Sequence, residues 1–262
     1  MSFATEVKNE LARIEPGKKC CQLSEIAGFL RVAGSIGLAG RGKFKIVITT
    51  ENPAIVRHYK KLIQEYFGIE TTLDIGESDF SGKTKTYNIN IDSENRSEQI
   101  LRETGILLVR EGNNYISDGI YEGIVKNKCC KKAYIRGVFM GAGTMSNPEK
   151  AYHLEFVCRT EAFASDLRKL INSFRDLEAK QYKRGKHYIV YMKKADYIAD
   201  TLGIMGADSH SLKVETTWVG KAMRNKVNRM ANCDNANVDK MVEASMKQAA
   251  AIDKIKNTKG LE

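Results

Sequence analysis

Six cysteines are the residues of this sequence best suited to binding a metal ion, and four of them form two adjacent pairs. Thiolates are good zinc ligands, but a zinc knuckle usually places two residues between its cysteines. The four histidines are scattered and add no partner pattern. We therefore expect reduced, buried thiols, with neither a bound metal ion nor another cofactor. The cysteines are Cys20, Cys21, Cys129, Cys130, Cys158 and Cys233.

Signatures of catalysis are weak elsewhere in the sequence. His153 and Glu155 share one face of a predicted strand and could suggest acid–base chemistry, but no nucleophile is placed beside them. The glycine-rich segment 37–42 has neither the preceding strand nor the following helix that a phosphate-binding loop requires. We expect a structural role for the first two residues and no nucleotide binding.

Positive charge is the clearest signal in the composition: 42 lysines and arginines against 32 acidic residues give a formal net charge of +10. Such an excess favours a polyanionic partner such as a nucleic acid, because these side chains displace counterions from a phosphate backbone. Two other interpretations stay open: lysines protect exposed strand edges, and arginine with asparagine caps and solvates a linker helix. The predicted DNA-contacting residues are Lys43, Lys45, Lys83, Lys85, Arg184, Lys186, Arg224, Lys226 and Arg229.

A repeat organises most of the chain. Each cysteine pair is followed by a segment rich in glycine and alanine, at residues 26–34 and 135–143. The separation between the two copies is the same at the cysteines and at the aligned glycines, which chance explains poorly. A glycine inside a helix costs about 1 kcal/mol, so several of them need a packing reason. We predict that two helices pack on each other through Gly28, Gly34, Gly137 and Gly143.

Similar elements follow both copies. The first half contains a β-branched run at 43–50, a helix from Pro53 to Gly68, strands at 69–75 and 84–91, and a helix at 97–104. The second half contains a strand at 152–158, a helical stripe at 163–174, a strand at 187–192 and a helix at 195–204. The sequence therefore predicts an α+β fold, a pseudo-twofold tandem repeat of an αββαββα unit.

The predicted division is a first half at 1–110, a second half at 111–206 and a helical linker at 207–262. After Gly206 the chain becomes rich in basic residues and asparagine, and a last amphipathic helix is expected at about 238–255. No stretch approaches the roughly 18 uninterrupted apolar residues of a membrane span. We therefore expect a cytoplasmic protein without membrane contact.

Both glycine-rich segments resemble degenerate copies of the LAGLIDADG signature of homing endonucleases, and the surrounding elements resemble that fold over roughly residues 20–206. The resemblance implies a saddle of two sheets that straddles duplex DNA. In the nucleases the eighth motif position is an acid in each copy, and the two acids hold catalytic metal ions. Here those positions are Ala33 and Ala142, whose methyl groups offer no oxygen to a divalent ion. We expect no enzyme activity, with Glu149 as the remaining acid that an active nuclease could recruit.

The whole chain resembles the WhiA family of regulators. The residues that carry this resemblance are the cysteine pairs, Ser2–Phe3 with 7–11, and segments 152–156, 225–229 and 232–237. Membership implies a nucleoid-associated, DNA-binding transcription regulator of sporulation, cell division or chromosome segregation, with a C-terminal helix-turn-helix domain that we expect to be missing or truncated here. The family also implies a possible iron–sulfur, WhiB-like co-regulator in some relatives. The alternatives are a protein-interaction module that recruits a co-regulator and an active homing endonuclease.

Overall fold

The structure, a computed structural model, describes residues 2–40, 43–77, 85–92 and 96–259. The chain divides into two compact units, residues 1–215 and residues 216–262. The described helices are α1 (Phe3–Leu11), α2 (Lys19–Ala33), α3 (Pro53–Phe67), α4 (Ser97–Glu103), α5 (Lys128–Ala142), α6 (Glu161–Asn172), α7 (Ala195–Met205), α8 (Asp208–Lys259) and the short 3-10 helix η1 (Glu122–Val125).

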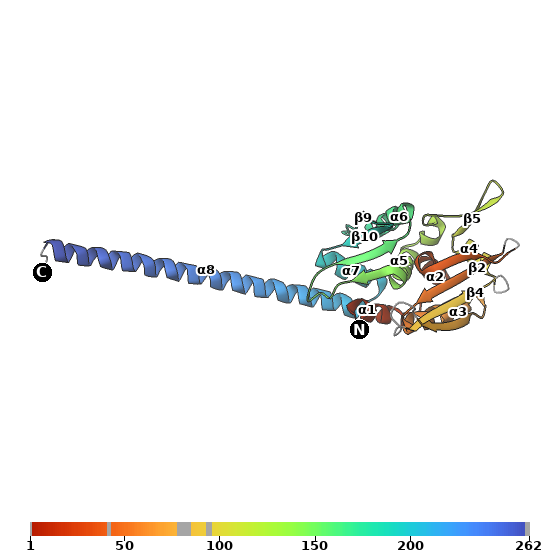
Figure 1. The fold of residues 1–262 in the computed structure, drawn as a ribbon, viewed down its shortest axis with the longest axis horizontal. Helices are drawn as coiled ribbons and strands as arrows, with labels where there is room; N and C mark the ends of the chain where they lie inside the picture. Colours follow the sequence, from red (N-terminus) through yellow and green to blue (C-terminus); the bar gives the residue numbers. More distant parts are fainter. Residues whose placement is uncertain (1, 41–42, 78–84, 93–95, 260–262) are drawn as a thin grey trace. The chain divides into compact units, whose positions relative to one another are not determined.

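Two four-stranded antiparallel sheets form the first unit together with its helices (Figure 1). The first sheet has the order β1-β2-β4-β3, with β1 (Gly34–Leu38), β2 (Phe44–Thr50), β3 (Thr72–Glu77) and β4 (Lys85–Ile91). The second has the equivalent order β7-β8-β10-β9, with β7 (Gly143–Met145), β8 (Leu154–Cys158), β9 (Lys180–Arg184) and β10 (His187–Met192). Each sheet is interleaved with three helices in the same sequence, which confirms the predicted αββαββα repeat.

Local sequence explains the first-half helix that was predicted with the most detail, α3. The Asn52 side chain caps its N-terminus by accepting from the backbone N–H of Ala54, and Pro53 occupies the first turn, where its missing N–H costs nothing. The helix ends at Gly68, whose φ of 64° is the left-handed conformation that glycine adopts readily. These signals confirm the helix from Pro53 to Gly68.

The core lies on one face of each sheet. In β2, Ile46 and Ile48 are buried and pair with Ile91 and Ile89 of β4, while the alternate residues of both strands face outward. Buried and outward-facing residues therefore alternate along these strands.

The segment between the two repeats contains a hairpin for which the sequence analysis predicted no strands. It consists of β5 (Leu107–Arg110) and β6 (Asn113–Ile116). The turn residues Glu111 and Gly112 have φ values of 53° and 80°, as a tight two-residue hairpin turn requires. The predicted end of the first half, at residue 110, therefore falls inside this hairpin.

The second unit, from Thr216 onward, is helical and belongs to α8 throughout its described part. The amphipathic helix predicted at 238–255 is a part of this longer element. Among the residues that the structure describes, no helix combines the length and the apolar character needed to cross a membrane.

Candidate nucleic-acid interface

The two motif helices, α2 and α5, lie against each other in the centre of the first unit (Figure 1). A Cβ added to Gly28 would collide with the backbone carbonyl of Tyr134, and a Cβ added to Gly137 would collide with that of Glu25. The two collisions occupy equivalent positions of the internal repeat, as a pseudo-twofold axis between the helices demands. Glycine at these two positions lets the helix backbones touch.

Gly34 and Gly143 have a different reason for being glycine. Each follows its motif helix as the C-cap and begins the next strand. A Cβ on Gly34 would press on the carbonyl oxygen of Leu30, and one on Gly143 would strike the ring of Phe139, both in the glycine's own repeat. These two glycines therefore serve the tight turn from helix to strand, whereas Gly28 and Gly137 serve the contact between helices.

The positions of the lost acids are the last residues of the two helices. Ala33 and Ala142 are both half-buried, and a Cβ added to Gly141 would lie 3.3 Å from the Cβ of Ala33. The helices therefore still approach each other here, but these two side chains end in methyl groups that cannot ligate a cation. Glu149 lies in an exposed turn after β7, where its backbone N–H donates to the Asn147 side chain.

Two arginines line a cavity of about 210 Å³ beside this end of α2. Arg31 donates to the carbonyls of Ser117 and Gly105, which flank the β5–β6 hairpin, the second bond at 3.4 Å. Arg159 donates to the carbonyl of Gly34 at 3.0 Å. Arg31, the sixth residue of the first motif, is thus an anchor for the connecting hairpin.

A buried ionic network that the sequence analysis missed joins three helices. Glu25 of α2 is fully buried and accepts from Nε and Nη2 of Arg136 of α5, at 2.9 and 2.5 Å, and forms an ion pair of 2.7 Å with Nε2 of His58 of α3. Arg136 also donates to the carbonyl of Met205 at 3.0 Å. Because both carboxylate oxygens are occupied and closed to solvent, the network fixes the helices and offers no group to a substrate.

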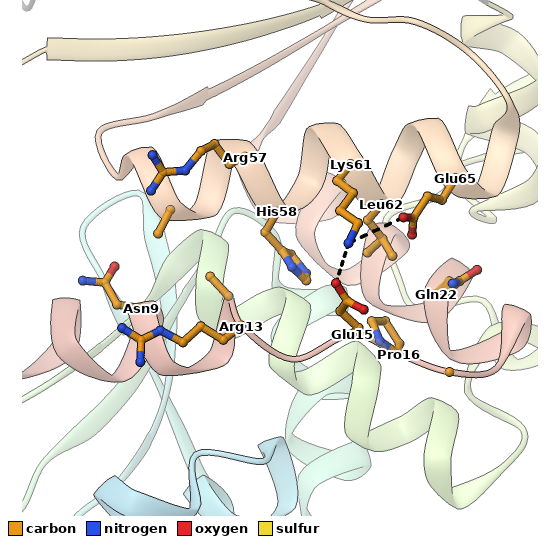
Figure 2. Close-up of a pocket in the computed structure, with 13 residues that line it drawn as sticks. Asn9, Arg13, Glu15, Pro16, Gln22, Arg57, His58, Lys61, Leu62 and Glu65 are labelled. Atoms are coloured by element: carbon orange, nitrogen blue, oxygen red, sulfur yellow. Dashed lines mark hydrogen bonds and ion pairs between the residues drawn. The ribbon is translucent and has the colours of Figure 1, made fainter.

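A cavity of about 720 Å³ opens between α1 and α3. Figure 2 shows His58 and Lys61 of α3 facing Arg13 and Glu15, with Lys61 between the carboxylates of Glu15 and Glu65. The hydrogen bond from Lys61 holds the pKa of Glu15 below its ordinary value, and the pKa of Lys61 is raised in return. Lys61 is paired with two acids, and the lining includes no cysteine or serine, so this cavity has the character of a surface cleft.

The outward face of the first sheet is polar and carries one of the predicted DNA contacts. Lys45 is exposed on this face of β2. Thr49 donates to Asn88 at 2.8 Å on the same face. Lys85 lies at the start of β4, and by strand alternation its side chain belongs to the other face of the sheet from Lys45. Lys43 is exposed just before β2. Lys83 lies outside the described residues.

The outward face of the second sheet is richer in aromatic and paired charged groups. Arg184 makes two bonds to the carboxylate of Glu155, at 3.2 and 3.1 Å, so its charge is largely neutralised. Burial alone would raise the pKa of Glu155, but hydrogen bonds from His153 and Arg184 outweigh it and lower that pKa. Tyr182 packs on Tyr191 with ring centroids 5.3 Å apart. Lys186 lies in the exposed β9–β10 turn.

The three predicted contacts in the second unit are all exposed on α8 but do not form one patch. At 3.6 residues per turn, Arg224 shares a face with Asn228, whereas Lys226 points to a different side of the helix. Arg229 donates from Nε to the carbonyl of Asn225 at 3.3 Å. Among the described residues, the structure therefore places Lys45 but not Lys85 on the outward face of the first sheet, and it directs Arg224 and Lys226 to different sides of α8.

Three family models match consecutive parts of this chain. A model described as the WhiA N-terminal LAGLIDADG-like domain matches residues 19–107, and one described as the WhiA LAGLIDADG-like domain matches residues 131–224. A model described as the WhiA C-terminal HTH domain matches residues 227–262, of which the described part lies in α8.

Two solved structures share the fold. The crystal structure of full-length DUF199/WhiA from Thermatoga maritima superposes with a TM-score of 0.73 and 22% identity, covering 99% of this chain and 81% of that chain. The crystal structure of I-DmoI, a homing endonuclease, in complex with DNA and Mn gives a TM-score of 0.50 and 13% identity, covering 72% of this chain and 98% of that one. The fold is therefore that of a LAGLIDADG protein.

Curated relatives extend over the whole chain. A protein named "Probable cell division protein WhiA" from Thermoanaerobacter pseudethanolicus is 43% identical over 262 residues, which cover 100% of this chain and 82% of the relative. A protein of the same name from Alkaliphilus metalliredigens is 41% identical over 261 residues, with the same two coverages. Matching family models, full-length relatives and a shared fold together show that this chain belongs to the WhiA family.

Proposed function

We propose that this chain is a DNA-binding transcription regulator of the WhiA type whose LAGLIDADG-like body has no catalytic activity. The observation that carries the proposal is the pair of alanines, Ala33 and Ala142, at the touching ends of the motif helices. The match of residues 227–262 to a helix-turn-helix domain supports the DNA-binding part. Its role would lie in cell division, sporulation or chromosome segregation, at the nucleoid in the cytoplasm.

The loss of catalysis follows from the ligand chemistry of divalent ions. Mg²⁺ is bound in proteins through carboxylates, other oxygens and water, and metal-assisted hydrolysis needs that ion beside the scissile phosphate. Methyl groups at both motif positions supply no such ligand. Arg31 and Arg159 add positive charge beside the same end of α2. A site of this composition attracts a phosphate without activating water against it.

The ion pairs in the structure suggest which of the predicted contacts should contribute most to DNA binding. Lys45 projects from the outward face of the first sheet and Lys186 from an exposed turn of the second, and this exposure supports both as phosphate contacts. Arg184 is tied to Glu155 and must break that ion pair before it can bind DNA. We therefore expect larger contributions from Lys45 and Lys186 than from Arg184.

The test is a titration of the full chain against duplex DNA at several salt concentrations. We expect binding that weakens steeply with salt, and a slope of log K against log salt that falls by about one unit for each phosphate contact removed. Lys45→Ala and Lys186→Ala should each lower the slope. Lys169→Ala is the matched control, because this exposed lysine lies on α6 and not on a sheet face.

The outcomes separate the alternatives. Failure to bind any duplex at low salt would contradict the proposal and favour a protein-interaction module instead. Cleavage of supercoiled plasmid in Mg²⁺ or Mn²⁺ that disappears in Glu149→Gln would show an active endonuclease. Recruitment of an iron–sulfur co-regulator stays a prediction from the family resemblance.

A further inference from the structure

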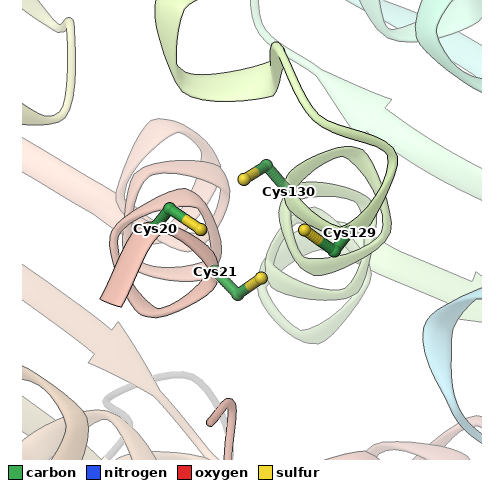
Figure 3. Close-up of side chains that lie close together, drawn as sticks. All are labelled: Cys20, Cys21, Cys129 and Cys130. Atoms are coloured by element: carbon green, nitrogen blue, oxygen red, sulfur yellow. The ribbon is translucent and has the colours of Figure 1, made fainter. Parts of the chain in front are cut away.

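The two cysteine pairs meet at the other end of the motif helices. Cys20 and Cys21 lie in the first turn of α2, and Cys129 and Cys130 occupy the same places in α5. All four are free thiols, and their sulfur atoms lie within 4.8 Å of one another. Figure 3 shows the four sulfurs directed into the space between the helices. The expected burial holds for Cys21 and Cys130 but is wrong for Cys20, which is exposed.

The close approach of these thiols is a product of the helix packing described above. Backbone contact at Gly28 and Gly137 sets the distance between the helix axes, so the first turns of both helices stay near each other. Two successive residues at the start of each helix then face the gap from opposite sides. The pseudo-twofold repeat thus supplies two ligand atoms from each half, a symmetrical donor set.

The dimensions of the cluster fit a single soft metal ion. Zinc bound by four thiolates has Zn–S distances of about 2.3 Å, which separates the sulfurs of a regular tetrahedron by about 3.8 Å. Sulfurs already confined within 4.8 Å reach that geometry through small side-chain rotations. An iron–sulfur cluster distributes its thiolates over several iron atoms and requires a wider donor set.

The surroundings offset the negative charge that such a site would carry. The first-turn N–H groups of both helices point toward this end, and neither N-cap residue, Lys18 or Asn127, bonds them with its side chain. The Asn127 side chain instead donates from Nδ2 toward Sγ of Cys130 at 4.0 Å. Lys19 and Lys128 begin the two helices beside the cysteines.

We propose that the four paired cysteines bind one Zn²⁺ ion and that this ion clamps the two repeats together at the N-terminal ends of α2 and α5. Binding replaces four S–H bonds by four Zn–S bonds and releases four protons to solvent, with no change of oxidation state. A closed site with four protein ligands leaves no position for water, so its role is structural. The sequence analysis expected no metal ion because the cysteines within one segment have the wrong spacing for zinc. In the structure, the ligands come from two segments, 20–21 and 129–130.

The test begins with the full 262-residue chain, purified with a reductant and without chelator. Elemental mass spectrometry should find one zinc ion per chain. Replacement of zinc by Co²⁺ should give the intense visible bands of tetrahedral cobalt and a thiolate-to-cobalt charge-transfer band in the near ultraviolet. Displacement of cobalt by added zinc then measures the affinity.

Variants identify the ligands. Cys20→Ser and Cys129→Ser each remove one ligand from an accessible position, and each should weaken metal binding by about 100-fold or more, beyond the usual cost of losing an outer-shell partner. Cys233→Ser is the matched control, because this thiol is exposed on α8 and outside the cluster, and it should bind metal as the parent chain does. Circular dichroism separates loss of the ligand from loss of the fold.

Three results would overturn the proposal. The first is a folded chain with substoichiometric zinc and no cobalt bands. The second is unchanged affinity in Cys20→Ser and Cys129→Ser. The third is a pair of disulfides across the two helices in protein prepared without air, because oxidised sulfurs cannot serve as the four thiolate ligands.

Discussion

The two ends of the α2–α5 pair share one packing geometry but present opposite chemistry. At the N-terminal end, four thiols from both repeats converge within 4.8 Å. At the C-terminal end, Ala33 and Ala142 stand where related nucleases are expected to hold acids, and they present only methyl groups. Between the two ends, the same backbone contact at Gly28 and Gly137 holds the helices together. The comparison teaches that the helix interface supplies the symmetry, while a few terminal side chains decide which ion, if any, is bound.

The middle of the helix pair should show the largest effect on stability, because both ends depend on it. Gly28→Ala places a Cβ against the carbonyl of Tyr134, and we expect the free energy of unfolding to fall by about 3 kcal/mol or more. Gly220→Ala is the matched control, since a Cβ there meets nothing within 4 Å on α8, and it should be neutral or stabilising by up to about 1 kcal/mol. Denaturant unfolding measures both. Equal stability of the two variants would contradict the direct backbone contact.

Loss of the buried ion pair should have an effect of similar size. Glu25→Gln leaves Arg136 buried without its counter-charge, and we expect a loss of about 3–5 kcal/mol in the free energy of unfolding. Glu98→Gln breaks an exposed pair with Arg102 on α4 and should cost less than about 1 kcal/mol. Chemical denaturation of the two variants in parallel gives the difference. A small effect of Glu25→Gln would show that solvent reaches the network.

Removal of the proposed zinc ion should lower the free energy of unfolding of the chain. If the proposed site is about 1,000-fold saturated, a chelator should remove about 4 kcal/mol of stability, visible as a lower unfolding temperature. Acid should act in the same direction, since protons compete with zinc for the thiolates. The Cys20→Ser variant should no longer respond to chelator, whereas Cys233→Ser should respond fully. A parent chain whose unfolding temperature is insensitive to chelator would argue against the clamp.

Restoring acids at the C-terminal end should give the smallest effect. The double variant Ala33→Asp, Ala142→Asp adds two negative charges at helix C-termini, which the helix dipoles disfavour by about 0.5 kcal/mol each. Mg²⁺ should restore stability if the two carboxylates converge on one ion, and the matched double asparagine variant should not respond. Thermal unfolding with and without Mg²⁺ measures this. No difference between the two double variants would mean that the ends stand too far apart to share an ion.

Periodicity and repetition in the sequence predicted most of the fold. The aligned glycines located both motif helices, and capping signals located α3. The hairpin strands β5 and β6 were not located from the sequence, and neither were β1, β7 and β9, the last three for identifiable reasons. The strand β1 is rich in glycine, β7 has three residues, and β9 is a lysine-rich edge strand whose sequence gives little hydrophobic alternation.

The candidate sites were harder to predict because they depend on contacts between distant segments. Glu25 and Arg136 look like ordinary charged residues in the sequence, and only the packing of α2 on α5 shows them as a buried pair. The paired cysteines fail every linear zinc pattern because each helix supplies half of the cluster. Arg184 was predicted as a DNA contact from its charge, and its pairing with Glu155 across the intervening strand β10 could not be seen from the sequence.

The one-sided Glu25–Arg136 pair also determines which helices can associate. In the internal repeat, Arg136 corresponds to Ala27, and Glu25 corresponds to Tyr134, so the interface is chemically directional although its backbone is symmetrical. Two copies of α2 pressed together would bury two carboxylates with no guanidinium between them. The Glu25–Arg136 pair therefore favours association of the first repeat with the second over association of two first repeats.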